Sequence, residues 1–288
     1  MIYERRASPL HATRAAASSG WCVVLALVAL SFEHPLVLGV LLGTLLLAAV
    51  GARVGRRVLL ALAFSLPIAV AWALINPLVD RQGLTVIARL GEVPALGQLD
   101  ITAEATAYGG VLGLRVLVVI GCFALLSAAV DPDDLLRAFR RISFRSALTA
   151  ALATRMVPVL ARDARRLHDA QRCIAGEPAP RRAVVRAVAS SALDRAVDVA
   201  ATLEVRGYGA ARRAPRGGGR PWSRHDLAFA ASAVALAAIG LAATLGDWER
   251  FAAYPSFSAP VDPRLLVLCA ALAACALVPF ADRRGIGR

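Results

Sequence analysis

The fold is decided by residues 131–209, which begin DPDDLLR (131–137) and end LEVRGYG (203–209). This stretch is rich in arginine, helical in its pattern of apolar residues, and too polar to cross a membrane. Long apolar runs flank it on both sides. A large polar helical insert between apolar runs predicts a membrane protein whose working surface lies on one side of the bilayer.

The composition agrees with membrane insertion and restricts the chemistry. Of the 288 residues, 58% are hydrophobic, and the mean hydropathy is +0.61. Soluble domains are nearer half apolar, and the excess here is clustered in runs. All 33 basic residues are arginine. The chain therefore has neither the lysine of a nucleotide-binding P-loop nor a lysine that could form a Schiff base.

The net charge of +13 is compatible with nucleic-acid binding or with the excess of basic residues on the cytoplasmic side of membrane proteins. The positions of the arginines favour the second explanation, so nucleic acid is not expected as a partner. They concentrate in residues 1–14, 53–57, 131–225 and 282–288. Both termini and the insert are therefore predicted to be cytoplasmic. The cysteines and histidines share no metal-ligand spacing, so no metal site and no cofactor are expected.

Six apolar runs have lengths that suit membrane-spanning helices. They cover residues 21–32, 36–52, 58–79, 105–130, 227–245 and 265–281. The predicted organisation is an N-terminal membrane part with four spans (1–130), a cytoplasmic region (131–225) and a C-terminal membrane part with two spans (226–288). Residues 80–104 are expected to form a long connection on the outer side, and residues 1–14 a polar N-terminal segment.

Three helices are predicted within the insert. Asp131 and Pro132 suit a helix cap and first turn, and Gly207 ends the third helix, which begins near residue 183. Apolar residues line one side of that helix: Val184, Val188, Ala192, Val199 and Leu203. Asp133 and Asp134 follow the cap, where acidic side chains favour the helix dipole. Alternatively they bind Mg²⁺ in a membrane-embedded enzyme, although no second acidic cluster completes such a site.

Arg115 lies inside the fourth apolar run, about 16 Å along its helix from Glu104 at 1.5 Å per residue. An arginine near the middle of a bilayer is costly and usually faces the helix bundle. It marks either a transport path or a structural contact, and the sequence does not identify its partner.

Short motifs occur in a fixed order along the chain: NPL (76–78), YGGVLGLR (108–115), the stretch 131–141, RMVP (155–158), AQR (170–172) and LEVRGYG (203–209). In their order and spacing the sequence resembles the transmembrane coupling (T) component of energy-coupling factor (ECF) importers, the EcfT/CbiQ-like family. The resemblance covers nearly the whole chain.

In that family, two cytoplasmic coupling helices each end in an Ala-Arg-Gly-like motif that docks on an ATPase subunit. The resemblance implies ATPase-coupling residues at both ends: Val205, Arg206, Gly207, Arg172, Cys173, Ile174 and Ala175. The second motif matches with valine in place of alanine. In the first motif, Ile174 and Ala175 stand where the family has arginine and glycine. Either Arg172 substitutes from nearby, or the first contact is largely apolar.

The resemblance implies an all-α fold with about six membrane helices and amphipathic coupling helices. It also implies a non-catalytic subunit of an ATP-driven importer of a vitamin or a transition metal ion, in the cell (plasma or inner) membrane. The expected partners are two ABC-type ATPase subunits, a membrane-embedded substrate-binding S component and the lipid bilayer. The rivals are the Mg²⁺-dependent enzyme and a stand-alone secondary transporter. Such a transporter needs ionisable groups in several spans, whereas the runs contain chiefly Arg115 and Asn76.

Overall fold

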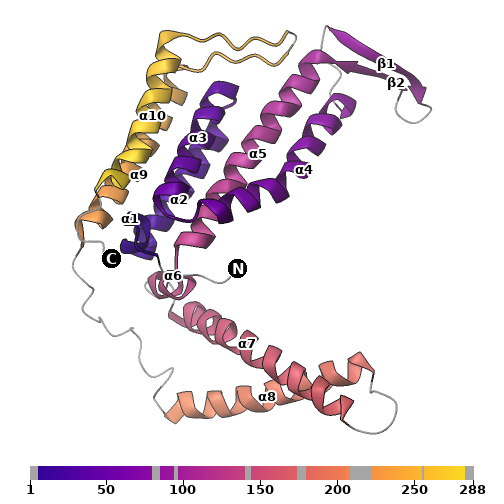
Figure 1. Ribbon diagram of the computed structural model, residues 1–288, viewed down its shortest axis with the longest axis vertical. Coiled ribbons are helices and arrows are strands. Elements are labelled where there is room, and N and C mark those ends of the chain that lie inside the picture. Colours follow the sequence, from indigo (N-terminus) through magenta and orange to yellow (C-terminus); the bar gives the residue numbers. More distant parts are fainter. Residues whose placement is uncertain are drawn as a thin grey trace. The chain divides into compact units, whose positions relative to one another are not determined.

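The computed structural model describes residues 6–79, 85–93, 97–139, 144–173, 180–205, 207, 222–254 and 256–282. The chain folds into two compact units (Figure 1). Unit 1 comprises Met1–Pro132 and Pro221–Arg288, and unit 2 comprises Asp133–Arg220.

All six apolar runs form helices of unit 1. Its helices are α1 (Pro9–Ala12), α2 (Ala15–Ser31), α3 (Pro35–Gly51), α4 (Gly55–Val79), α5 (Ala103–Ala129), α9 (Arg224–Leu245) and α10 (Pro263–Ala281). By length and composition, α4, α5, α9 and α10 can each cross a membrane, whereas α2 and α3 are shorter apolar helices of 17 residues each. The predicted all-α polytopic membrane fold is confirmed.

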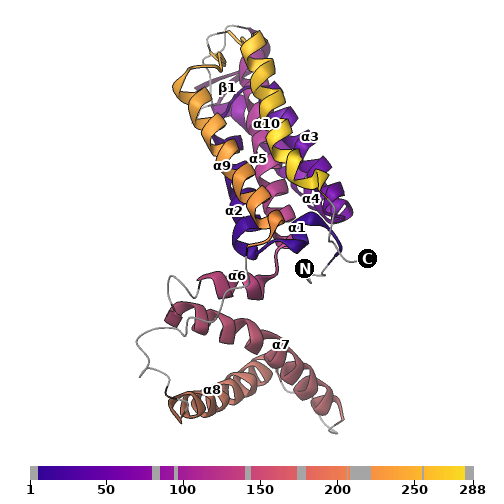
Figure 2. The same ribbon diagram turned by 90° about the vertical axis from the view of Figure 1, so that its left-hand side faces the viewer.

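The apolar helices of unit 1 pack against one another as a bundle. Helix α2 packs against both α5 and α9, α10 packs against α9 and α3, and α4 packs mainly against α5 (Figure 2). Trp21 of α2 lies in the core, with its ring centroid 5.7 Å from those of Phe229 and Phe280. Its indole N–H donates to the Ser232 hydroxyl at 3.0 Å, and that hydroxyl donates to the Cys275 carbonyl at 2.6 Å. These contacts join α2, α9 and α10.

Small residues let α4 and α5 approach closely. A Cβ atom added to Gly113 would lie 2.6 Å from the Ala69 carbonyl oxygen, and one added to Gly109 would lie 2.9 Å from the Ala73 Cα. We call this contact the α4–α5 seam. Backbones that come so close tolerate only glycine on the α5 side, as in tightly packed membrane helices.

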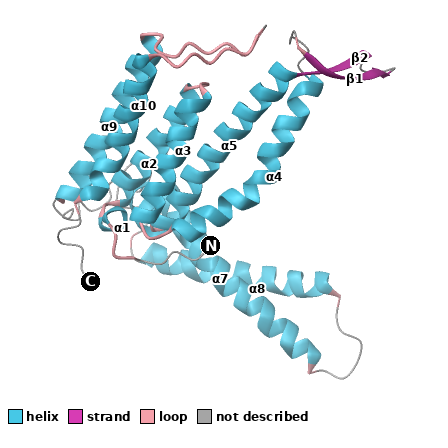
Figure 3. Ribbon diagram, turned by 45° about the horizontal axis from the view of Figure 1, so that its top comes forward, coloured by secondary structure: helices cyan, strands magenta, loops and turns pink. Residues whose placement is uncertain are grey.

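The segment expected to be a plain connection contains a β-hairpin. Strands β1 (Val86–Val93) and β2 (Gly97–Thr102) pair antiparallel, from Val86 opposite Thr102 to Val93 opposite Gly97. Figure 3 shows them in magenta beyond the ends of α4 and α5. A hydrogen bond fixes the base of the hairpin, because the Glu104 carboxylate accepts the Thr85 N–H at 3.1 Å.

The polar N-terminal segment contains a short helix. Helix α1 is capped by Ser8, whose hydroxyl accepts the His11 N–H, and Leu10 belongs to the apolar core. The structure thus adds a short helix to this polar segment, with Leu10 packed in the apolar core.

Unit 2 contains the three helices predicted for the insert: α6 (Pro132–Phe139), α7 (Phe144–Arg172) and α8 (Arg181–Val205). Helices α7 and α8 pack together, and Arg195 of α8 forms an ion pair with Asp163 of α7 at 3.0 Å. The predicted apolar side of α8 is half-buried, whereas Val185, Leu193 and Val197 are exposed.

Candidate functional site

The end of α8 has the geometry of a glycine-terminated helix. Val205 is its last residue, and its side chain is 89% exposed. Gly207 has φ +74°, a left-handed conformation that favours glycine, and its N–H donates to the Glu204 carbonyl at 2.8 Å. The predicted stop at Gly207 is therefore present. Arg206 lies outside the described residues.

The end of α7 is described only in part. The helix ends at Arg172, and the Cys173 N–H donates to the Ala170 carbonyl at 3.1 Å. The Cys173 side chain is exposed. Ile174 and Ala175 lie outside the described residues, so the prediction of an altered first motif stays a prediction.

The structure does not bring the two helix ends together. The end of α7 leads within a few residues to the start of α8, whereas the second motif follows the other end of α8. Helix α8 has 25 residues and is therefore about 36 Å long.

The acidic pair considered as an enzyme site is exposed at the first turn of α6, where Asp133 and Asp134 favour the helix dipole. Among the described residues, no three or more histidine, cysteine or acidic side chains gather as a metal site.

The structure identifies the groups that contact Arg115, which the sequence did not identify. Its Nη2 donates to the Phe32 carbonyl at 2.9 Å and forms an ion pair with Glu33 at 3.2 Å. The Arg115 side chain is 16% exposed, and its Nε is buried without a hydrogen-bond partner among the described residues. The contact arises because α2 is short, so the turn between α2 and α3 lies beside the middle of α5.

Glu249, from the segment between α9 and α10, contacts the same turn. Its carboxylate accepts the N–H groups of Glu33, at 2.6 Å, and of His34. Burial raises the pKa of Glu249, even though these two hydrogen bonds and the Arg115 charge favour its ionised form. The sequence analysis did not identify Glu33 and Glu249. The only feature that marked them in the sequence is their position at the ends of apolar runs.

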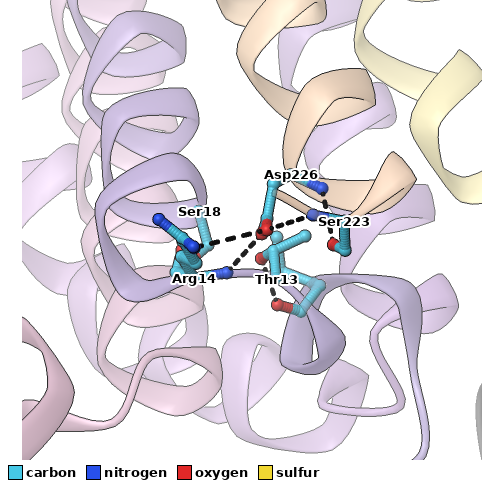
Figure 4. Close-up of polar contacts among 6 residues, drawn as sticks. Thr13, Arg14, Ser18, Ser223 and Asp226 are labelled. Carbon is cyan, nitrogen blue, oxygen red and sulfur yellow. Dashed lines mark hydrogen bonds and ion pairs between the residues drawn. The ribbon is translucent and has the colours of Figure 1, made fainter. Parts of the chain in front are cut away.

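A second polar group joins the starts of α2 and α9 (Figure 4). Asp226 lies in the first turn of α9 and is only 2% exposed. Its carboxylate accepts the Arg14 N–H at 2.7 Å and the Ser223 N–H at 2.9 Å. The Ser223 hydroxyl in turn accepts the Asp226 N–H at 3.2 Å, which completes a capping box.

Asp226 therefore serves two helices, because Arg14 is the N-cap residue of α2 and forms no side-chain cap bond of its own. The Arg14 Nε lies 3.6 Å from the Asp226 carboxylate, and its guanidinium carbon lies 5.5 Å from the Trp222 ring centroid. We call Arg14, Trp222, Ser223 and Asp226 the clasp. The Ser-x-x-Asp spacing is a readable capping signal, but Arg14 lies 212 residues from Asp226, so sequence alone could not pair them.

Comparison with protein families identifies the chain. The family model of CbiQ, described as cobalt transport protein, matches residues 6–216, which is most of the chain. The chain belongs to the CbiQ family. The expected resemblance to the EcfT/CbiQ-like family is therefore confirmed. A search of curated proteins found no match.

As a CbiQ-family protein, the chain is a component of a cobalt or ECF-type transporter and a multi-pass membrane protein. The match includes α1 to α8 and ends before α9 and α10.

Proposed function

We propose that this CbiQ-family chain is the transmembrane coupling component of an ATP-driven ECF-type importer. One observation carries the proposal: α8, in a polar unit inserted between apolar helices, ends in an exposed Val205 and a left-handed Gly207. A helix that stops at glycine lets the intervening Arg206 project beyond the last turn. Its planar guanidinium suits a groove lined with carboxylates or carbonyls on a partner.

Two ABC-type ATPase subunits are the proposed partners of unit 2. The first motif follows α7 and the second follows α8, whose own two ends are about 36 Å apart, so we expect each motif to dock in a separate groove. Separate docking of each end lets relative motion of the two ATPase subunits act on the α7–α8 pair. In this scheme ATP is hydrolysed by the partner subunits, because this chain has no lysine for a phosphate-binding loop.

The membrane-embedded S component is the proposed partner of α4. This helix packs mainly on α5 and exposes large apolar side chains around most of its remaining surface, Phe64 among them at 82% exposure. In a bilayer, lipid tails or another membrane protein cover such a surface. The S component binds the substrate, which is either a vitamin or a transition metal ion such as cobalt.

The proposed orientation places both termini and residues 131–225 on the cytoplasmic side of the cell membrane. The membrane parts are then 1–130 and 226–288. The concentration of arginine in the termini, in the segment after α3 and in the insert supports this orientation.

Reconstitution tests this function. The chain is purified alone and with two ABC-type ATPase subunits and an S component, and each preparation is placed in vesicles. Alone, it should hydrolyse no ATP and take up no Co²⁺, and the full complex should show ATP-dependent uptake. Uptake of Co²⁺ by vesicles that contain this chain alone would favour the rival secondary transporter and overturn the proposal.

A further inference from the structure

The chain leaves unit 1 after α5, whose last residues Ala128 and Ala129 are buried. Unit 1 resumes shortly before α9, and Trp222 and Ser223 precede that helix. All four clasp residues lie in unit 1, within the first turns of α2 and α9 or just before them.

The clasp joins the starts of two helices through one buried carboxylate. One carboxylate, 2% exposed, accepts backbone N–H groups from the N-cap residues of two different helices and pairs with a guanidinium. Exchanging such buried, charge-assisted bonds for water is costly, so the two helix starts are held together. The Trp222 ring beside Arg14 extends the contact to the residue that precedes the capping box.

Helix α2 also packs along α5, so it contacts both helices that connect to unit 2. We propose that the clasp couples α2 to α9, so that α2, α5 and α9 move as one body during the transport cycle. Arg14 and Asp226 are then positioning residues of the transport cycle. This inference rests on the proposed function, since it takes unit 2 as the part that the ATPase subunits move.

A distance measurement in the assembled transporter tests the clasp without depending on the substrate. Spin labels at Ala16, exposed on α2, and Leu227, exposed on α9, report the separation of the two helix starts. In the wild-type complex this separation should be the same with and without bound ATP. In Asp226→Asn, the ratio of clasped to open forms should fall by about tenfold, the scale of weakening hydrogen bonds to a charged group, and the separation should change when ATP binds.

Two further variants separate coupling from stability. Arg14→Gln keeps the backbone N–H that Asp226 accepts but loses the ion pair and the Trp222 contact, so it should give a smaller change of the same kind. Asp282→Asn removes the half-exposed ion pair of Arg224 with Asp282 and should leave the distance unchanged. Each variant is compared at equal amounts of assembled complex, and Co²⁺ uptake per ATP hydrolysed should fall only in the clasp variants.

The outcomes distinguish the clasp from the proposed function. If Asp226→Asn and Arg14→Gln assemble and keep the wild-type distance in both nucleotide states, the clasp is a structural contact only and the inference is wrong. If the wild-type chain recruits no ATPase subunits, the proposed function fails first, and the inference fails with it.

Discussion

The buried and half-buried charges of unit 1 contact helix ends of matching polarity. The Arg115 guanidinium lies against the carbonyl of Phe32, the C-cap residue of α2. The carboxylates of Glu249 and Asp226 accept N–H groups at the starts of α3, α2 and α9. Cations at the C-terminal ends of helices and anions at the N-terminal ends are favoured by the helix dipole. In an apolar bundle these contacts give charges a partner where water is scarce.

Replacing Arg115 tests this arrangement at one residue. Arg115→Ala should lower the stability of the detergent-solubilised protein by about 1–3 kcal/mol, because the Phe32 carbonyl loses its donor in a poorly hydrated place. The measurement is the unfolding transition in mild detergent. Arg250→Ala, at an exposed position, is the matched control and should change little. Equal transitions for Arg115→Ala and wild type would show that Arg115 has no structural role.

The partners of these charges show what the sequence could and could not predict at this scale. The cost of Arg115 in an apolar run, and its tendency to face the bundle, follow from the residue type alone. The identity of its partner depends on where the turn after Ser31 falls beside α5, which is a property of the packed bundle. The same holds for the pairing of Arg14 with Asp226.

At the scale of elements, the α4–α5 seam shows how small residues set the packing of unit 1. Gly109 and Gly113 are four residues apart and therefore lie on the same side of α5. They face Ala73 and Ala69 of α4, so the small residues of one helix meet those of the other. The Asn76 side chain adds a hydrogen bond from its amide to the Ala105 carbonyl at 2.9 Å.

Two glycines of α5 provide a matched test of the seam. Gly113→Ala should destabilise the protein by about 1–3 kcal/mol, since the new methyl group meets the Ala69 backbone and the helices must move apart. Gly110→Ala meets nothing within 4 Å and should be neutral or stabilising by up to about 1 kcal/mol, because alanine favours helix. Unfolding in mild detergent measures both. Equal losses in the free energy of unfolding for the two variants would contradict the close contact of α4 and α5 at Gly113.

Elements with a strong local pattern were predictable, and elements held by distant contacts were not. The six apolar runs and the half-buried side of α8 follow from hydropathy and helical spacing. Helix α1 has four residues and depends on packing by Leu10. The hairpin is irregular, with register shifts between Val86 and Ala88 and between Arg89 and Glu92, which obscure a two-residue alternation.

At the scale of the whole molecule, composition changes sharply near residues 131 and 225, and the structure forms two compact units that divide at residues 132–133 and 220–221. The fold and the family are now established, whereas orientation and partners are proposals. The candidate ATPase-coupling residues were identified by resemblance alone, and the structure adds the exposed Val205 and the left-handed Gly207.

Single cysteines test the proposed orientation. In a background with the exposed Cys173 replaced by serine, a cysteine at Arg56 should resist an impermeant thiol reagent in intact cells, and one at Ser256 should react. Both positions are exposed, so the difference reports sidedness rather than burial. Labelling at Arg56 without lysis contradicts the orientation.

The unequal motifs predict unequal contributions from the two helix ends. Ile174→Ala should weaken binding of the ATPase subunits by about 1–3 kcal/mol at most, the scale of one buried aliphatic side chain. Ile174→Arg restores the family's arginine and should bind as well as wild type or better. Arg172→Ala decides whether this neighbour substitutes, and a loss as large as that from removing Arg206 would show that it does. Pull-down of the ATPase subunits measures all three variants.

The affinity of Arg206→Ala for the ATPase subunits tests the central claim most directly. Truncating one member of a desolvated charge pair costs about 2–5 kcal/mol, so binding should weaken by about tenfold or much more. Arg206→Lys should rescue poorly because it lacks the planar fork of donors. Arg186→Ala, exposed on the same helix, should bind like wild type. If Arg206→Ala inserts into the membrane, binds the ATPase subunits and supports uptake as wild type does, Arg206 is no coupling residue and the account is wrong.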